Sequence, residues 1–142
     1  MFKKIKNITK ESFEKYGYVI SYDANKTERF QILLSEKNSV GWRMAVSKII
    51  GKSISKISKH PDSMESFEPL DGVTLICVAL PESPEEYEVF LLDKPVCLNQ
   101  NIYHATLCLS DYSIVKITEN LNVGTEEYKL SKEMQFGLFS ML

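Results

Sequence analysis

The clearest strand pattern in the chain is Val73-Thr74-Leu75-Ile76-Cys77-Val78-Ala79-Leu80. This segment is rich in β-branched residues, is apolar at odd and even positions alike, and is bounded by Gly72 and Pro81. A short strand that is apolar on both faces is typical of a position with neighbours on both sides. We therefore expect residues 73–80 to lie at the centre of a β-structure.

Shorter strand patterns precede and follow this segment, separated by turn-forming residues such as those of Asp93-Lys94-Pro95. They are residues 18–20, 30–34, 42–46, 54–58, 88–92, 97–98, 106–109 and 113–117. Eight or more short strands predict an all-β protein with a closed or sandwiched barrel. One short helix is expected over residues 10–16, capped by Thr9 and closed by Gly17.

The length of 142 residues is that of one compact domain. We expect a barrel domain over residues 1–119 and a tail over residues 120–142 that packs on the barrel or on a second subunit, as in a homodimer. The tail contains four apolar residues at helical spacing after a cap at Ser131. They are Leu130, Met134, Leu138 and Phe139. We expect the tail to be helical or extended.

Composition restricts the partners and the location. The 17 basic and 19 acidic residues are interspersed and give a net charge of −2, so no basic face is available for nucleic acid. No apolar run reaches the length of roughly 20 residues that crosses a membrane. The N-terminus lacks the apolar stretch of a signal peptide, and we expect a cytoplasmic protein. Cys77, Cys97 and Cys108 lie in apolar runs, and we interpret them as reduced core residues.

The two histidines of the chain both lie beside turns. His60 precedes Pro61, and His104 follows Asn99-Gln100-Asn101. A histidine near a strand end is often a hydrogen-bonded structural residue, and the alternative is that the two form a polar site.

The spacing around His60 resembles the first metal-binding motif of the cupins, in which His-x-His is followed by glutamate and glycine. His60, Glu65 and Gly72 match the second half of this motif, whereas Ser58 stands at the position of its first histidine. The later motif ends with glycine, two residues and histidine, and Asn101 and His104 occupy those positions. Asparagine is an adequate substitute because it tolerates the left-handed conformation usually given to glycine. The resemblance implies a cupin-type double-stranded β-helix, or jelly roll.

Two imidazoles and one carboxylate are a sufficient set of ligands for a divalent metal ion such as zinc, manganese, iron or nickel. His60, Glu65 and His104 are therefore candidate metal ligands as well as candidate catalytic residues.

A more particular resemblance is to the ureidoglycolate lyase family, cupins that split ureidoglycolate into glyoxylate and urea in allantoin degradation, the ureide branch of purine catabolism. It rests on residues 9–20, on His60-Pro61 with residues 67–79, and on residues 102–107. The family usually has Glu-Arg where this chain has Ser58-Lys59, and glutamine where this chain has Glu65.

The resemblance implies acid–base roles for His60 and His104 in the cleavage of a carbon–nitrogen bond. Glu65 would orient an imidazole, bind a metal ion or act as a base. Arg43 is a candidate substrate-binding residue, because a guanidinium suits the carboxylate of a small acid. Lys59, which replaces the family's arginine, could make a weaker point-charge contact, and Tyr103 could line the pocket.

Three hypotheses remain open from the sequence. The first is a lyase acting on ureidoglycolate or a related small carboxylate or ureide. The second is a metal-dependent cupin of another reaction class, such as an isomerase or a dioxygenase, which Glu65 motivates. The third is a non-catalytic cupin that binds a small molecule.

Overall fold

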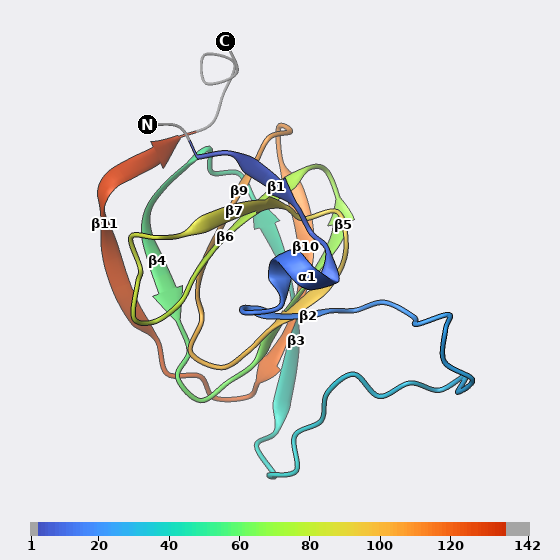
Figure 1. The fold of residues 1–142 in the computed structure, drawn as a ribbon. Helices are drawn as coiled ribbons and strands as arrows, with labels where there is room; N and C mark the ends of the chain where they lie inside the picture. Colours follow the sequence, from blue (N-terminus) through green and yellow to red (C-terminus); the bar gives the residue numbers. More distant parts are fainter. Residues whose placement is uncertain (1–2, 136–142) are drawn as a thin grey trace.

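The computed structural model describes residues 3–135, and within this range the chain folds almost entirely into strands (Figure 1). In chain order the elements are β1 (Ile5–Asn7), α1 (Lys10–Phe13), β2 (Gly17–Val19), β3 (Trp42–Ile49), β4 (Ser53–Lys59), β5 (Glu65–Asp71), β6 (Thr74–Ala79), β7 (Glu88–Leu91), β8 (Val96–Leu98), β9 (Tyr103–Cys108), β10 (Ser113–Asn120) and β11 (Glu126–Gln135). The strand series expected from the sequence is thus present except for residues 30–34, with β1, β5 and β11 in addition.

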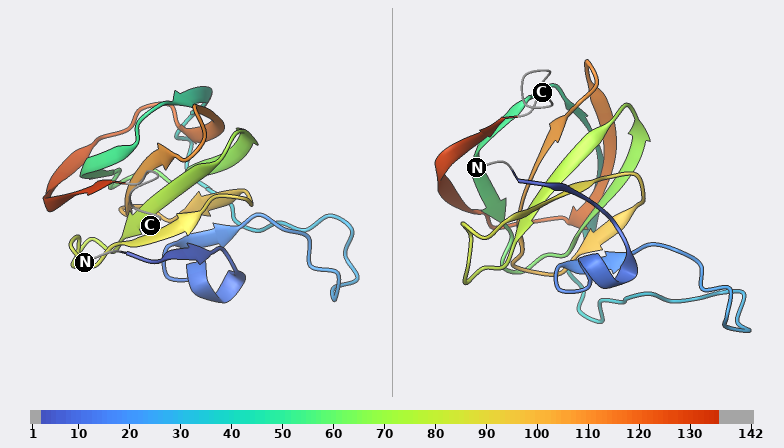
Figure 2. Two further views of the ribbon diagram at one scale, coloured as in Figure 1. Left: turned by 90° about the horizontal axis from the view of Figure 1, so that it is seen from above. Right: turned by 45° about the horizontal axis from the view of Figure 1, so that its top comes forward.

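The strands form two sheets with the orders β1-β7-β6-β9-β4-β11 and β2-β8-β5-β10-β3. Strands β3 to β10 contribute four to each sheet, and the chain crosses between the sheets after every one of them except β6. This is the strand order of a jelly roll, in which two Greek keys close around one core. All pairings are antiparallel apart from the parallel contact of β1 with β7. The expected cupin-type double-stranded β-helix is confirmed, and Figure 2 shows its two sheets from other directions.

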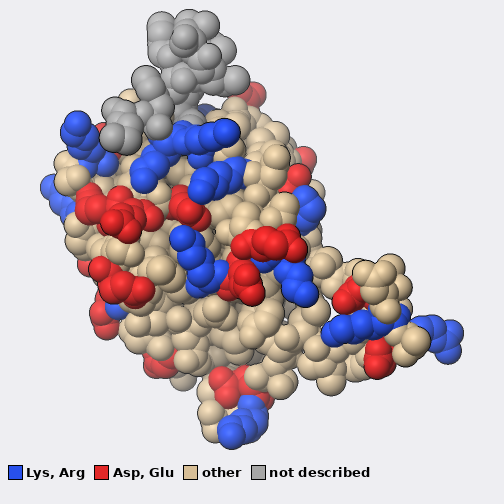
Figure 3. Space-filling model, viewed as in Figure 1, with Lys and Arg blue, Asp and Glu red and all other residues tan. Residues whose placement is uncertain are grey.

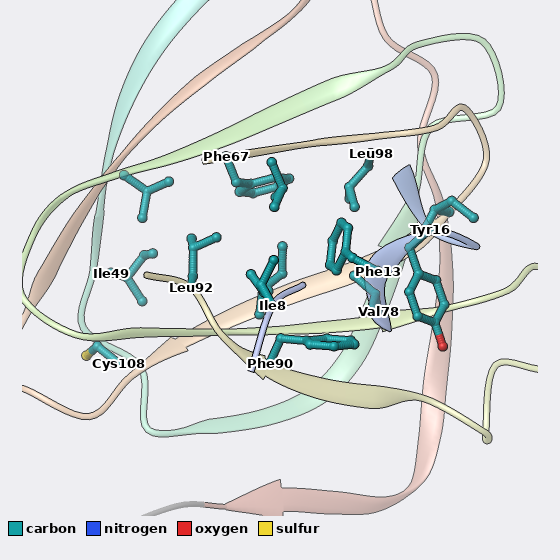
Figure 4. Close-up of a cluster of buried hydrophobic side chains, with 14 residues drawn as sticks. Ile8, Phe13, Tyr16, Ile49, Phe67, Val78, Phe90, Leu92, Leu98 and Cys108 are labelled. Atoms are coloured by element: carbon teal, nitrogen blue, oxygen red, sulfur yellow. The ribbon is translucent and has the colours of Figure 1, made fainter. Parts of the chain in front are cut away.

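Strand β6, which covers most of residues 73–80, is buried along its whole length between β7 and β9. Ile76 and Val78 face the barrel interior, where they join a cluster around Phe90 (Figure 4). Leu75 and Cys77 face the other way, into a second cluster with apolar residues of β4, β7, β9 and β11. The two clusters explain why this strand is apolar on both faces. All three cysteines are buried and free, as expected.

The short helix begins as predicted but ends earlier. The Thr9 hydroxyl accepts a hydrogen bond from the Ser12 N–H at 2.9 Å, and the Ser12 hydroxyl closes a capping box with the Thr9 N–H. Phe13 then packs edge-on against Phe90 at 5.2 Å between ring centroids, which fixes α1 on the barrel core. Gly17 already belongs to β2.

The strand predicted over residues 30–34 is wrong. This segment lies in the long connection between β2 and β3, which extends away from the barrel as an arm (Figure 1). Phe30 is 85% exposed and Ile32 is 73% exposed. β-Propensity describes residues that fit a half-buried pleated surface, and in the arm no neighbouring strand offers one.

The described part of the tail is extended, which is one of the two conformations expected for it. Residues 126–135 form β11, which pairs with β4. Leu130 and Met134 are buried as the pattern suggests, but an interval of four residues returns to the same face of a strand as well as of a helix. Leu138 and Phe139 lie outside the described residues.

Charges of both signs are interspersed over the face seen in Figure 3, in keeping with the expected absence of a basic surface there. Among residues 3–135, no helix is long and apolar enough to cross a membrane.

Candidate metal centre

The fold brings both histidines and Glu65 to one end of the barrel. His60 follows β4, Glu65 begins β5, and His104 lies in β9. Ser58 of β4 pairs with His104 of β9, which brings His60, two residues after Ser58, close to His104. Strand β5 belongs to the opposite sheet, and its first residue therefore reaches the same point from across the barrel.

The three side chains converge within contact distance. Oε1 of Glu65 lies 2.9 Å from Nε2 of His104 and 3.2 Å from Nε2 of His60. The exposed fraction of the side chain is 12% for each histidine and 9% for Glu65. These atoms lie within 4.8 Å of one another, as the ligands of a single metal ion do.

The opposite ring nitrogens show how each imidazole is oriented. Nδ1 of His60 lies 3.0 Å from the carbonyl oxygen of Gly124, and Nδ1 of His104 lies 3.1 Å from that of Ile102. Because a carbonyl oxygen only accepts, both Nδ1 atoms carry a proton. In the neutral form each Nε2 lone pair then faces the Glu65 carboxylate. Metal-binding histidines are commonly oriented in this way by a backbone carbonyl.

The turn before His104 has the backbone conformation predicted for it. Asn101 has a φ of 68°, in the left-handed region where asparagine replaces glycine most readily. Its N–H donates to the carbonyl oxygen of His60 at 2.9 Å. The hydrogen bond ties the β8–β9 turn to the segment that carries the first histidine, so the left-handed residue positions both imidazoles.

Electrostatics without a metal ion favour a charged pair. Burial disfavours the imidazolium of His104, but the hydrogen bond and the charge of Glu65 outweigh burial and raise the pKa of His104. Burial likewise opposes ionisation of Glu65, while its contacts with His104 and His60 lower the pKa of Glu65. Both shifts favour an ionised Glu65 beside a protonated His104.

A second carboxylate, Glu119 of β10, belongs to the site and was missed in the sequence. Its Oε1 lies 3.9 Å from Nε2 of His60. Its Oε2 accepts from Nε of Arg43 at 2.8 Å and lies 2.6 Å from Nη2 of Arg43. Glu119 lies close to the cluster because it pairs with Glu65 across β10 and β5. These two residues are 54 positions apart, and no local sequence motif predicts which residues of two such distant strands pair.

The structure divides the three predicted substrate-binding residues. Arg43 reaches the cluster through Glu119, and half of its side chain (49%) is exposed. Lys59 and Tyr103 lie on the other face of the sheet: Tyr103 belongs to the second apolar cluster, and Nζ of Lys59 lies 5.2 Å from the centre of its ring. Adjacent residues of a strand point to opposite faces, so His104 and Tyr103 do not face the same space.

The space between His60, Glu65 and His104 has no room for a water-sized molecule. A groove of about 520 Å³ lies beside β10 and β5, and its lining includes Ser66 and Thr118. These two residues alternate with Glu65 and Glu119 along their strands, so the groove lies on the other face of the sheet from the cluster.

The arrangement fits a divalent metal ion. Metal–ligand bonds of about 2.0–2.2 Å place neighbouring ligand atoms about 3 Å apart, close to the contacts of Glu65 with the two imidazoles. Glu119 has the Arg43 guanidinium on its Oε2, whereas the described partners of Glu65 are the two imidazoles, whose Nε2 atoms can bind either a proton or a metal ion. His60, Glu65 and His104 would hold such an ion.

No protein-family model matches the chain, and no curated protein matches it. Among solved structures it is similar to a mutant of oxalate decarboxylase from Bacillus subtilis, with a TM-score of 0.46 and 12% identity over 65% of this chain and 24% of that one. It is also similar to a dTDP sugar isomerase from Desulfovibrio desulfuricans, with a TM-score of 0.44 and 9% identity over 75% of this chain and 71% of that one. The jelly roll rests on its own strand order, and the resemblance to ureidoglycolate lyases stays a hypothesis.

Proposed function

We propose that this jelly-roll protein binds one divalent transition-metal ion between His60, Glu65 and His104 and acts on a small carboxylate or ureide there. The observation that carries the proposal is the convergence of two Nε2 atoms and one carboxylate oxygen, with both Nδ1 atoms committed to backbone carbonyls. When bound, such an ion would polarise a substrate oxygen and stabilise negative charge that develops on it.

The surrounding residues support a small anionic substrate. Arg43 is half-exposed and presents a guanidinium that suits a carboxylate. Glu65 contacts both imidazoles, and the opposite ring nitrogen of each lies beside a backbone carbonyl.

Metal analysis tests this proposal. The protein is purified without chelators, stripped, and titrated separately with Zn²⁺, Mn²⁺, Fe²⁺ and Ni²⁺ by calorimetry. We expect one ion per chain for at least one metal, and loss of binding in His60→Gln and His104→Gln. Lys59→Gln serves as the control, because Lys59 adjoins His60 in the chain but contacts Tyr103 and Glu126 on the other face. A wild-type protein that binds none of the four ions contradicts the proposal.

The lyase reaction is the more specific form of the proposal. The meeting of His60 and His104 supports it, whereas Glu65 stands where that family usually has glutamine and supports a metal-dependent cupin of another reaction class. In that reaction the hydroxyl of ureidoglycolate loses a proton, the carbon–nitrogen bond breaks to give glyoxylate, and the urea nitrogen gains a proton. His60, His104 and Glu65 are the groups that would move these protons. Metal-loaded protein is incubated with ureidoglycolate, and turnover above the spontaneous rate is expected. A rate equal to the spontaneous one eliminates the lyase and leaves the metal site to be judged by its own titration.

A further inference from the structure

We infer that Glu119 is the fourth protein ligand of this metal site and that Arg43 is the positioning residue that turns it inward. The inference rests on the proposed function, since it concerns the same ion. It completes the ligand set with a residue from β10, a strand that carries neither of the sequence motifs described above.

The first argument is the unused oxygen of Glu119. The Glu119 side chain is only 9% exposed, and its Oε1 is buried with no hydrogen-bond donor among residues 3–135. The Glu119 side chain contacts the Glu65 carboxylate, which is also an acceptor when ionised. Two buried carboxylates in contact are costly without a proton or a cation between them. Oε1 of Glu119 lies 3.9 Å from Nε2 of His60 but outside the group of ligand atoms within 4.8 Å of one another, so a small rotation of the side chain would bring it to an ion there.

The second argument is the way Arg43 holds the same carboxylate. Two guanidinium nitrogens, Nε at 2.8 Å and Nη2 at 2.6 Å, contact the other oxygen, Oε2. Arg43 and Glu119 are also direct partners in the pairing of β3 with β10, so the backbone fixes the geometry. With Oε2 fixed from outside, Oε1 is directed inward. Hydrogen bonds of this kind to a ligating carboxylate are typical supports of a metal site.

The third argument is the absence of a histidine at one motif position in β4. Where the metal-binding cupin motif has its first histidine, this chain has Ser58, which cannot supply an imidazole. Ser58 pairs with His104, and Glu119 pairs with Glu65 on the opposite sheet. The donor missing from one sheet is therefore replaced by a carboxylate from the other. Two imidazoles and two carboxylates form a harder ligand set than three imidazoles and one carboxylate, and they favour manganese or iron(II) over copper(I).

The test uses calorimetric titration of the full-length protein with Mn²⁺, together with the visible spectrum of the Co²⁺-loaded protein, which reports the ligand set directly. Glu119→Gln keeps the shape of the side chain and removes its charge. We expect its Mn²⁺ affinity to fall at least tenfold and its Co²⁺ bands to shift. Glu68→Gln is the matched control, because Glu68 also lies in the barrel sheet but pairs with Lys116 at 3.4 Å, away from the cluster.

Arg43→Gln tests the positioning role. It should weaken Mn²⁺ binding by less than Glu119→Gln does, and Arg43→Lys should not restore the Co²⁺ spectrum, because a single ammonium cannot replace the two-nitrogen contact. A purely structural role would leave the spectrum of both arginine variants unchanged.

The outcomes separate the two proposals. If wild-type protein binds metal and Glu119→Gln binds it equally well with an unchanged Co²⁺ spectrum, Glu119 is not a ligand, and the site of three residues stands. If wild-type protein binds neither Mn²⁺ nor Co²⁺ nor the other ions tested, the proposed function fails, and this inference fails with it.

Discussion

Metal-dependent stabilisation should depend on pH in a direction that the cluster itself determines. Without metal, the raised pKa of His104 means that its imidazolium contributes stability in full below its usual value of 6.5 and loses it as pH rises through the higher folded value. The lowered pKa of Glu65 means that its carboxylate contributes above its usual value of 4.5 and loses this contribution as pH falls through the lower folded value. This pair therefore stabilises the metal-free protein best between the two, near pH 5 to 6.

Metal binding is instead favoured by a higher pH, because the ion must displace the proton from Nε2 of His104. Below the folded pKa of His104, competition from this proton weakens the affinity for the metal ion about tenfold for each pH unit. At a metal concentration 100 times the Kd, the ion stabilises by about 2.7 kcal/mol, and at ten times the Kd by about 1.4 kcal/mol. For a domain of this size these values correspond to increases in Tm of roughly 10 °C and 5 °C.

The assay is thermal unfolding at one fixed metal concentration and at pH 5.5, 6.5, 7.5 and 8.5, each with a chelated reference. We expect the metal-induced increase in Tm to grow with pH from 5.5 upwards and to level off once the pH exceeds the raised pKa of His104. His104→Gln should abolish the increase at every pH, whereas Glu68→Gln should reproduce the wild-type series. An increase in Tm of the same size at all four pH values would refute the reasoning, since it would mean that no histidine proton is displaced.

Three further predictions concern the fold. Phe90→Ala should lower the free energy of unfolding by about 3–5 kcal/mol, and Phe30→Ala on the exposed arm should change it by less than about 0.5 kcal/mol, both measured in urea. Gly72→Ala should destabilise by more than about 1 kcal/mol in the same assay, because φ is +73° and a Cβ would lie 2.4 Å from the carbonyl oxygen of Tyr112; a neutral result would mean that the turn adapts. Sedimentation velocity should show the expected homodimer, and a monomer at high micromolar concentration would exclude it.

The sequence was sufficient for those parts of the fold that local pattern determines. Residues 73–80 and the turn residues around them predicted the central strand and the all-β class, because burial on both faces is visible in composition. Thr9 and Asn101 were predictable for the same reason, since capping and left-handed turns depend on a few neighbouring residues. Residues 30–34 were misjudged because strand propensity does not show whether a neighbouring strand is present, and the interval of four residues in the tail does not distinguish a helix from a strand.

In the candidate site, too, local sequence predicted some residues, whereas others depend on long-range strand pairing. His60, Glu65 and His104 were found through their spacing, which reflects two strand ends that local sequence describes. Glu119 was missed because its place beside Glu65 depends on the pairing of β10 with β5, a long-range register without a local signature. Conversely, Lys59 was placed near the site by its position next to His60, whereas alternation along the strand directs it to the opposite face.

The most direct test of a metal centre at His60, Glu65 and His104 is the metal stoichiometry of the protein after stripping, reloading with a divalent transition metal and removal of free ions by gel filtration. We predict one ion per chain in the wild-type protein and in Glu68→Gln, and much less than one in Glu65→Gln. Retention of no metal by the wild-type protein, or of a full equivalent by Glu65→Gln, would contradict this account.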